Sequence, residues 1–398
     1  MHRIMLLLLL LVSFLLIPDL YIYLMYIVRK TRNRWLRFAY WMPTLLLLAG
    51  FVLLMMAMGE NSMALHPLAV GRYAVVVFLL IIPKLLFMIC SLAGLPFRYG
   101  LHWRCAPFTA AGLVLAAVGF GCVLYGATAG ISHFEVKEVE FRHPDLPAGF
   151  DGYRIVQLSD IHTGSWTGDE ASVRKLVAKV NALNPDLILF TGDLVNQRAV
   201  ELTEFQFTLS ELHARDGVYS VLGNHDYGTY FHWTNPADEI ANLDSLIAKK
   251  KQMGWTLLDN EHRILHHHGD SIALIGVGNY NDHFRPQETV RTRPQYADLQ
   301  KATAGADSLF SILLSHNPNH WEREVLPDSR IALTLAGHTH GMQVILFNHS
   351  LASLLFKEWR GMYTENHRSL YVNVGVGYVG LPLRFGAWPE ITEITLRR

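Results

Sequence analysis

The sequence has 398 residues, of which 51% are hydrophobic, and its 34 basic residues balance its 34 acidic residues. This length can hold two domains. The balanced charge argues against a nucleic-acid-binding protein, which normally carries a basic excess. The apolar residues are concentrated in roughly the first third of the chain, where all three cysteines, Cys90, Cys105 and Cys122, also lie. A disulfide framework and a cysteine nucleophile are therefore excluded from the remainder.

Four apolar stretches in the first third are each long enough to cross a bilayer, which takes about 20 residues. They cover residues 4–28, 38–58, 73–95 and 107–129. The first is too long for a cleaved signal peptide, and a basic cluster follows it. The stretches also lack the polar face that a helix of a soluble domain shows. Residues 1–132 are therefore predicted to form an all-α transmembrane bundle of four helices.

The charges of the connecting loops predict the orientation of this bundle. Basic residues follow the first and third spans, whereas the loop 59–72 carries one acid and one base. The basic residues concerned are Arg29, Lys30, Arg32, Arg34, Arg37, Arg98 and Arg104. Basic loops stay in the cytoplasm. We therefore expect an integral protein of the inner (plasma) membrane whose C-terminal domain is periplasmic or extracellular, although one span more or fewer would invert this orientation.

Lys84 lies in the middle of the third span, beside Pro83. A charge inside the membrane is a functional candidate. The favoured alternative is that Lys84 faces the bundle interior and pairs with a backbone carbonyl or a lipid phosphate. No other ionisable pathway is expected in the spans, which argues against a transporter.

From about residue 133 the pattern changes to short β-like runs that alternate with amphipathic helices. Residues 133–152 join the two parts and contain a first strand at 136–141, and residues 153–398 form the second domain. Strands at 153–159 and 187–190 flank a helix at 169–183, which is typical of a βαβ unit. Further strands are predicted at 218–222, 309–314, 331–335, 370–374 and 390–396. This order favours an α/β domain built as a mixed β-sandwich flanked by helices.

Five polar blocks directly follow apolar runs of this second domain. They read Asp160-Ile161-His162, Gly192-Asp193, Gly223-Asn224-His225-Asp226, Ser315-His316-Asn317 and Gly337-His338-Thr339-His340. Carboxylates and imidazoles bind divalent first-row metals, and strand ends of α/β sheets carry ligand sites. Strand alternation would point Asp160 and His162 the same way, and likewise His338 and His340. The neighbouring glycines, Gly192, Gly223, Gly337 and Gly341, would allow tight turns.

These residues predict hydrolysis at phosphorus. Asp193 is the candidate that bridges two metals, because it stands between the first pair and the later ligands. A bridged pair polarises a phosphoryl oxygen and activates a water, whose hydroxide attacks phosphorus. His225 follows the ligand Asn224 and could donate a proton to the leaving oxygen or stabilise its charge. Asp226 could orient the His225 ring.

The blocks resemble the calcineurin-like metallophosphoesterase superfamily, whose pattern is D-x-H, G-D, G-N-H-D/E, H and G-H-x-H. The contexts 158–164, 335–343 and 373–377 are similar to a bacterial membrane-linked branch that contains lipid A precursor pyrophosphatase-like enzymes. The resemblance implies an α/β metallophosphoesterase domain with two divalent ions, Mn, Fe or Zn. It implies one ion held by Asp160, His162, Asp193 and His340, and the other by Asp193, Asn224, His316 and His338.

Several other residues have two readings each. Arg384 could clamp the substrate phosphate or form a salt bridge near the C-terminus. Asn224 is also a candidate for contact with the substrate. The tract His266-His267-His268 could bind metal, but an exposed turn is favoured. His320 and Trp321 are expected to pack in the core. Asn279, Asp282 and His283 could line the mouth of the site.

The leading hypothesis is a membrane-anchored phosphoesterase with two metal ions that hydrolyses a phosphodiester or pyrophosphate, with a lipid headgroup as the motivated substrate. The alternatives are a tethered phosphodiesterase or nucleotidase acting on a soluble substrate, and a ligand-binding sensor domain. The expected partners are the lipid bilayer and a phosphate ester that is lipid-linked in the leading hypothesis. Neither a nucleic acid nor a protein partner is indicated.

Overall fold

The computed structural model describes residues 2–57, 67–100, 106–281, 295–328 and 331–398. The chain forms two compact units, Met1–Thr128 and Ala129–Arg398, close to the boundary predicted at residue 132. Most of the loop 59–72, together with Arg104, Asp282 and His283, lies outside the described residues.

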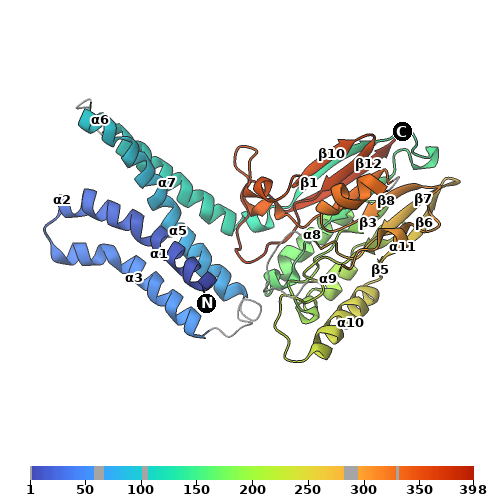
Figure 1. Ribbon diagram of the computed structural model, residues 1–398, viewed down its shortest axis with the longest axis horizontal. Helices are drawn as coiled ribbons and strands as arrows, with labels where there is room; N and C mark the ends of the chain where they lie inside the picture. Colours follow the sequence, from blue (N-terminus) through green and yellow to red (C-terminus); the bar gives the residue numbers. More distant parts are fainter. Residues whose placement is uncertain (1, 58–66, 101–105, 282–294, 329–330) are drawn as a thin grey trace. The chain divides into compact units, whose positions relative to one another are not determined.

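The first unit, which we call the anchor, is helical (Figure 1). Its helices are α1 (His2–Ile22), η1 (Tyr23–Ile27), α2 (Val28–Lys30), α3 (Arg34–Ala57), α5 (Pro67–Ala93), α6 (Leu95–Gly100) and α7 (Ala106–Ala127). Four helical stretches in the described residues are long and apolar enough to cross a membrane: Val12–Lys30, Arg34–Leu54, Leu68–Phe97 and Ala106–Ser132. The four predicted spans are confirmed. Gly112 and Gly119 share one face of α7, where a Cβ would crowd Phe87 and Leu86 of α5, so these glycines let the two helices approach closely.

An ion pair with a buried carboxylate joins two spans of the anchor. Lys84 Nζ on α5 lies 2.6 Å from Asp19 Oδ1 on α1. Tyr40 donates a hydrogen bond to Asp19 Oδ1 at 3.1 Å, and Thr44 Oγ1 donates to Asp19 Oδ2. The expectation that Lys84 pairs with a carbonyl or a lipid phosphate was therefore wrong. Asp19, which the sequence places inside the first span, is a second ionisable group, and its carboxylate is wholly buried.

The second unit holds all five polar blocks that are predicted to carry the chemistry, so we call it the catalytic unit. It contains two sheets in its described residues. The first has the order β1-β12-β2-β3-β4-β5, and the second has the order β10-β11-β9-β8-β7-β6. The strands are β1 (Glu135–Arg142), β2 (Arg154–Leu158), β3 (Leu187–Phe190), β4 (Val218–Ser220), β5 (Trp255–Leu257), β6 (Glu261–His267), β7 (Asp270–Gly276), β8 (Phe310–Leu314), β9 (Leu333–Ala336), β10 (Gly361–Glu365), β11 (Arg368–Val372) and β12 (Glu390–Arg397). Both sheets mix parallel and antiparallel neighbours, as the predicted mixed sandwich requires.

Apolar side chains from both sheets fill the space between them. Ile155 and Leu189 of the first sheet belong to the same buried cluster as Leu274, Ile312 and Leu335 of the second. This central core fixes the two sheets against each other, so the ends of their strands hold a defined relative position. The functional side chains described below follow strands of both sheets.

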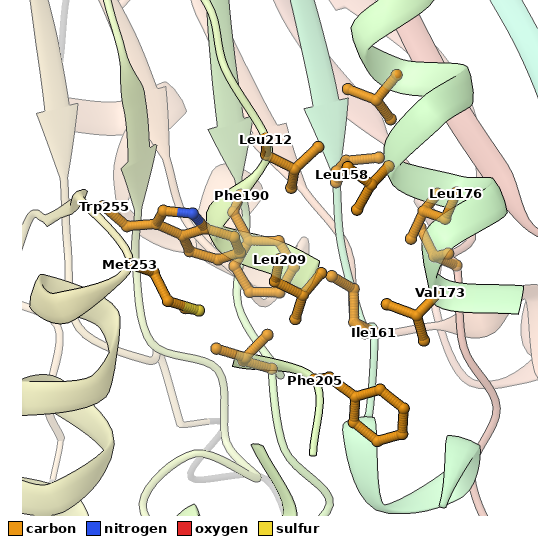
Figure 2. Packing of buried hydrophobic residues seen from close by; sticks show 14 of the residues in the cluster. Leu158, Ile161, Val173, Leu176, Phe190, Phe205, Leu209, Leu212, Met253 and Trp255 are labelled. Carbon is orange, nitrogen blue, oxygen red and sulfur yellow. The ribbon is translucent and has the colours of Figure 1, made fainter. Parts of the chain in front are cut away.

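Helices cover the outer faces of the sandwich. The helices beside the first sheet are α8 (Glu170–Ala182), α9 (Gln206–Ser210) and α10 (Pro236–Gln252). The helices that follow β7 of the second sheet are α11 (Leu299–Thr303), η6 (Trp321–Val325) and α12 (Leu326–Asp328). Short 3-10 turns are η2 (Gly130–Ser132), η3 (Ala148–Phe150), η4 (Thr163–Trp166), η5 (Ala199–Leu202), η7 (His340–Gln343) and η8 (Leu351–Leu354). Figure 2 shows Val173 and Leu176 of α8 in one cluster with Leu158 and Phe190 of the sheet. The predicted βαβ unit is therefore present, with β2 and β3 parallel.

The segment that joins the anchor to the catalytic unit is part of the first sheet. All eight residues of β1 pair with β12 in parallel register, from Glu135 opposite Glu390 to Arg142 opposite Arg397. β12 also pairs with β2 on its other side. The first sheet thus begins three residues after Ser132, where the last candidate span ends.

Two of the minor expectations are confirmed. The histidine tract covers the end of β6 and the start of the turn to β7, with His266 and His268 exposed. His320 is buried, where its ring stacks on Tyr280 at 4.7 Å and its Nδ1 lies 2.9 Å from Ser315 Oγ. Neither observation supports a metal site at these positions.

Candidate metal centre

The five polar blocks converge from both sheets. Asp160, Asp193 and Asn224 follow β2, β3 and β4 of the first sheet, and His316 and His338 follow β8 and β9 of the second. The three strands of the first sheet run parallel, and so do the two of the second, so the blocks leave each sheet at one edge. The structure therefore brings together residues that lie up to 180 positions apart in the sequence.

The backbone aims these side chains by a route that the sequence did not predict. Asp160 (φ 53°), His162 (φ 51°), Asp193 (φ 59°), His338 (φ 74°) and His340 (φ 50°) all have left-handed backbone conformations. The pairs therefore lie beyond the strand ends, and strand alternation is not what aligns them. A non-glycine residue in this region is uncommon, and such strain gathers at functional sites.

Two of the neighbouring glycines make room for the ligands. A Cβ on Gly337 would collide with Ser159 Oγ and Asp160 Oδ2, and a Cβ on Gly223 would collide with the carboxylate of Asp193. The predicted role in turns holds for Gly192 and Gly341, whose φ values are positive. At Gly223 and Gly337 the missing side chain instead lets two strand-end loops come into contact.

The predicted ligands form two adjoining groups. In the first, His340 Nε2 lies 3.1 Å from His162 Nε2 and 3.2 Å from Asp160 Oδ1. In the second, His316 Nε2 lies 3.1 Å from Asp193 Oδ2 and 3.3 Å from His338 Nδ1. Asn224 Oδ1 lies 3.1 Å from His316 Nε2 and so completes the second group.

Asp193 lies between the two groups. Its Oδ2 is 3.1 Å from His316 Nε2 and 3.6 Å from His162 Nε2, while its Oδ1 accepts a hydrogen bond from His225 N at 2.8 Å. One carboxylate thus faces ligands of both groups, which is the position that a bridging ligand needs. The separations are close to those between ligands of one ion whose metal bonds are about 2.0–2.2 Å long.

The protonation states of the carboxylates also fit metal ions. Burial raises the pKa of Asp193, but the imidazoles of His316, His225 and His162 outweigh burial and hold that pKa well below its usual range. Burial also raises the pKa of Asp160, and His340 and His162 again reverse the effect. Both carboxylates are therefore ionised at neutral pH, as metal ligands must be.

The imidazoles divide into two kinds. Burial is the main influence that lowers the pKa of His338 to about 3 and that of His340 to about 4, so both rings are neutral and able to ligate. Burial lowers the pKa of His316 as well, but the charge of Asp193 raises it to about 9. His316 must therefore release a proton when a metal binds at neutral pH.

His225 lies beside the two groups. Its Nδ1 is 2.5 Å from the carbonyl oxygen of Asn196, so Nδ1 carries the proton and Nε2 is left to exchange one. Burial lowers the pKa of His225. The ring stacks on Tyr230 with centroids 4.4 Å apart, and the Tyr230 hydroxyl accepts a hydrogen bond from Asn224 Nδ2 at 2.8 Å. Asn196 and Tyr230 were missed from the sequence, although Asn196 is a polar residue three positions after Asp193.

Asp226 does not orient His225 as predicted. Its carboxylate accepts hydrogen bonds from the backbone N–H groups of Asp193, Leu194, Val195 and Gly223, at 2.8–3.2 Å. It therefore ties the loop that follows β3 to the loop that follows β4. A buried carboxylate needs such partners because burial disfavours its charge.

Lys250 is the countercharge of Asp226. Its Nζ lies 3.7 Å from Asp226 Oδ2 and donates to the carbonyl of Val221 at 3.1 Å, and the residue is wholly buried. Burial lowers the pKa of Lys250, although Asp226 opposes the change. The sequence held a signal for this residue, because Lys250 shares a helix face with Leu246 and Met253, both buried.

The placement of Arg384 does not fit a phosphate clamp. The residue is wholly buried, and its guanidinium donates to the carbonyls of Gly377, Val374 and Ala387. Its Nη2 also lies 2.9 Å from His340 Nδ1, so Arg384 positions that ring. Burial lowers the pKa of Arg384 to about 10. The donors that a substrate phosphate would need are already used by the protein.

Asn279 does not contact the two ligand groups through its described hydrogen bonds. Its backbone N–H donates to the Tyr227 hydroxyl at 3.3 Å, and its Nδ2 donates to Asn281 Oδ1 at 2.8 Å. It is buried with 2% exposure. The prediction that it lines the mouth of the site is therefore not supported by these contacts.

Comparisons with known proteins agree with this fold and site. Residues 153–342 match the calcineurin-like phosphoesterase family, and residues 2–131 match a family described as a probable calcineurin-like phosphoesterase transmembrane domain. The chain is therefore a membrane protein that belongs to the calcineurin-like phosphoesterase family, whose members are metal-dependent phosphoric ester hydrolases. The resemblance seen in the five blocks is confirmed.

Three relatives show how far the likeness extends. The chain is 31% identical to the uncharacterized metallophosphoesterase YkuE of Bacillus subtilis, over 72% of this chain and 93% of that protein. It is 30% identical to a transmembrane protein with metallophosphoesterase domain from Danio rerio, over 73% of this chain but only 63% of that protein. It is 28% identical to the UDP-2,3-diacylglucosamine pyrophosphatase LpxG of Chlamydia trachomatis, over 64% of this chain and 87% of that protein.

Proposed function

We propose that this protein hydrolyses a phosphodiester or pyrophosphate with the help of two divalent metal ions, Mn, Fe or Zn. The observation that carries the proposal is the position of Asp193 Oδ2, which lies 3.1 Å from His316 Nε2 and 3.6 Å from His162 Nε2. One ion would be held by Asp160, His162, Asp193 and His340. The other would be held by Asp193, Asn224, His316 and His338. When bound, such ions polarise a phosphoryl oxygen and activate water.

The remaining residues of the site have distinct roles in this proposal. His225 would take up a proton from water at Nε2 and donate it to the leaving oxygen, because Asn196 holds the proton at its Nδ1. Asn224 is fixed between the Tyr230 hydroxyl and His316, and it can also face the substrate. Asp226 and Arg384 act as positioning residues, the first for the loop of Asp193 and the second for His340.

The substrate that we propose is a lipid-linked phosphate ester or diphosphate. The anchor keeps the site near a bilayer, which is where such substrates are found. The name of the Chlamydia trachomatis relative describes a pyrophosphatase that acts on UDP-2,3-diacylglucosamine, a diphosphate with acyl chains. A nucleotide or another soluble diester is the alternative, and it requires no role for the membrane.

The first test uses the purified full-length chain in detergent, supplied with Mn²⁺. We expect hydrolysis of bis-p-nitrophenyl phosphate, and we expect Asp193→Ala to reduce it to background and to lower the bound metal below two ions per chain. Asp145→Ala, at an exposed acid of the same unit, is the matched control and should change neither quantity. Metal-independent turnover, or undiminished turnover in Asp193→Ala, would refute the mechanism.

A second test identifies the substrate class. Vesicles made from a bacterial lipid extract and a panel of nucleotides are offered to the same preparation, and release of phosphate products is compared. Preferential cleavage of the lipid fraction supports the lipid-linked substrate. Preferential cleavage of nucleotides supports the soluble alternative. The variant His225→Ala distinguishes an enzyme from a ligand-binding sensor: an enzyme should lose all turnover while its metal is retained.

We also propose that the catalytic unit lies outside the cytoplasm, because basic residues follow the first and third spans. A reporter fused after Arg398 tests this orientation. Active alkaline phosphatase at that position supports it. Fluorescence of a fusion that folds only in the cytoplasm contradicts it.

A further inference from the structure

One loop of the catalytic unit combines an uncharged sequence with large exposed apolar side chains. The 15 residues 342–356, which we call the apolar loop, contain no Asp, Glu, Lys or Arg. Six of its large apolar side chains are exposed: Met342, Leu346, Phe347, Leu351, Leu354 and Leu355. The other large exposed apolar residues described in this unit, Val200, Phe207, Tyr230, Ile240 and Ile264, are spread over several elements. A concentrated apolar patch marks a surface that contacts a partner or a membrane.

The tip of the apolar loop is held in a conformation that exposes an aromatic ring. Leu346 and His349 exchange two backbone hydrogen bonds of 2.9 Å, and the two residues between them, Phe347 and Asn348, have φ values of 48° and 69°. Such two-residue turns normally select Asn or Gly, and a bulky residue at positive φ is strained. Phe347 is nevertheless 95% exposed, so burial within the unit does not compensate for this strain. Arg360 fastens the turn by donating to Asn348 Oδ1 at 2.7 Å.

Contacts within the catalytic unit connect the apolar loop to the first residues of that unit. Ile345 N donates to the carbonyl of Phe385 at 2.8 Å, and the Phe385 ring lies 5.6 Å from that of Trp388. Trp388 in turn lies 5.1 Å from the ring of His133. His133 directly follows Ser132, where the last candidate span ends. The loop and the point where the chain leaves this span therefore belong to the same end of the catalytic unit.

The same loop begins and ends at the candidate metal centre. It starts two residues after His340, and Ser350 Oγ donates to the carbonyl of Gly341 at 2.6 Å. At the other end of the loop, the Phe356 ring lies 5.5 Å from that of His338. Whatever contacts the exposed side chains is thus placed a short distance from the ligand groups.

We propose that the apolar loop inserts into the surface of the bilayer in which the chain is anchored. The residues that follow the loop suit this partner better than they suit a second protein. Arg360 stacks on Trp359 at 4.7 Å, and Lys357, whose side chain is 66% exposed, forms a surface ion pair with Glu322 at 2.7 Å. Tryptophan is enriched at the membrane interface, and basic residues are attracted to anionic lipid headgroups.

The insertion would bring the candidate metal centre to the lipid headgroups. This consequence rests on the proposed function, because it matters only if the substrate is lipid-linked. The membrane contact itself rests only on the exposed loop and on the anchor. The two can therefore be tested separately.

The test of membrane contact places an environment-sensitive nitrobenzoxadiazole label at the tip of the loop. The full-length chain is used in lipid nanodiscs of phosphatidylethanolamine and phosphatidylglycerol, with Cys90, Cys105 and Cys122 replaced by serine. The label is attached to Phe347→Cys or to the control Phe207→Cys, a phenylalanine that is 72% exposed on α9. Lipids brominated on their acyl chains quench a label that enters the bilayer. We expect quenching at least about threefold stronger at position 347 than at 207, together with a blue-shifted emission.

Two outcomes would overturn the insertion. Equal quenching at the two positions would show that the loop stays in water. A blue shift at position 347 without quenching by brominated lipid would show that a second copy or another protein covers the loop. An unfolding transition followed by circular dichroism, unchanged from that of the unlabelled chain, verifies that the labelled chains are folded.

A second variant separates this proposal from the proposed function. Phe347→Ser/Leu354→Ser should leave hydrolysis of bis-p-nitrophenyl phosphate unchanged and should reduce hydrolysis of vesicle lipid by about tenfold, because surface binding weakens as apolar area is lost. If vesicle lipid is no substrate but the label is quenched at 347, the loop inserts and the lipid-linked substrate is wrong. If vesicle lipid is hydrolysed equally by the variant and the label is not quenched, the insertion is wrong and the proposed function stands.

Discussion

The anchor and the candidate metal centre both bury ionisable side chains, but they treat them in opposite ways. In the anchor, Asp19 and Lys84 face each other at 2.6 Å, and Tyr40 and Thr44 supply further hydrogen bonds. In the catalytic unit, buried groups of the same kind face one another, such as the two imidazoles of His162 and His340, whose nitrogens are 3.1 Å apart. A buried charge needs a partner. The anchor supplies it from the chain, whereas the candidate metal centre fits partners that come from outside.

Removal of metal should have the largest effect on activity and stability, and it tests most directly whether the anchor and the candidate metal centre differ. We expect chelation by EDTA to abolish hydrolysis and to destabilise the catalytic unit by about 3–4 kcal/mol, the stabilisation given by a ligand present at 100 to 1,000 times its dissociation constant. The anchor should be unaffected because its charges pair with each other. Calorimetry of the full chain with and without EDTA measures the unfolding transitions of the catalytic unit and of the anchor. Addition of Mn²⁺ should restore the transition of the catalytic unit to its original temperature. A chelated protein that unfolds at the original temperature would show that the catalytic unit also satisfies its own charges.

Loss of one partner of the anchor's ion pair should destabilise the anchor more than loss of both partners. Lys84→Met leaves Asp19 buried and unpaired, and breaking a buried pair in this way costs about 3–5 kcal/mol. Asp19→Leu/Lys84→Met removes both charges and should recover most of that stability. Unfolding in a mixed-detergent titration, followed by helical circular dichroism, provides the measurement. If the double variant is no more stable than the single one, the pair is not compensating its own charge.

Arg384 tests the supporting contacts of the candidate metal centre. Arg384→Met removes the guanidinium that donates to the carbonyls of His340 and Gly377 and so holds the His340 loop in place. Loss of contacts that hold a metal ligand in place typically lowers metal affinity about 10–100-fold. Titration of the metal-free chain with Mn²⁺ measures this affinity without relying on turnover. Arg263→Met is the control, because Arg263 is exposed and its contacts in the described residues include Glu261 and its own neighbour His262. An unchanged affinity in Arg384→Met would mean that His340 is held without the guanidinium.

A partly exposed pair should give the smallest effect. Burial raises the pKa of Asp216, but hydrogen bonds from Arg215 and Tyr153 outweigh burial and lower that pKa below its ordinary value. The stability that Asp216 contributes is therefore present above the unfolded pKa of about 3.9. It is lost as pH falls through the lower folded pKa. We expect Asp216→Asn to cost less than about 1 kcal/mol at pH 7, and we expect the difference to shrink toward pH 3. Urea unfolding at both pH values measures the difference in the free energy of unfolding. A difference that grows on acidification would contradict the expected pH dependence.

The sequence predicted the features that depend on local pattern. Asp160, Asp193 and His338 stand directly after apolar strands, and parallel strands deliver such residues to one edge. The four spans follow from length and composition alone. The helix after Asp169 is also local, since Asp169 caps it by accepting a hydrogen bond from Ser172 N.

The features that depend on a distant partner could not be predicted in the same way. Arg384 is 44 positions from His340, and Lys84 is 65 positions from Asp19, so the sequence alone did not decide between a ligand contact and an internal one. Asp226 is a clearer case, because its neighbour His225 is the obvious partner and yet its carboxylate binds the backbone of the preceding loop. The left-handed backbone of the ligand loops also arises from tertiary contacts, which no strand pattern reveals.

The position of β12 has a consequence for the order in which the protein is made. This strand follows every predicted metal ligand in the chain, yet it lies between β1 and β2 and pairs with both. During synthesis the spans emerge first and β1 follows directly. More than two hundred further residues are synthesised before its partner β12 is made. An unpaired strand edge can join strands of other chains, and incomplete domains aggregate for this reason. β1 therefore lacks the strand with which it pairs in the finished sheet until β12 has emerged.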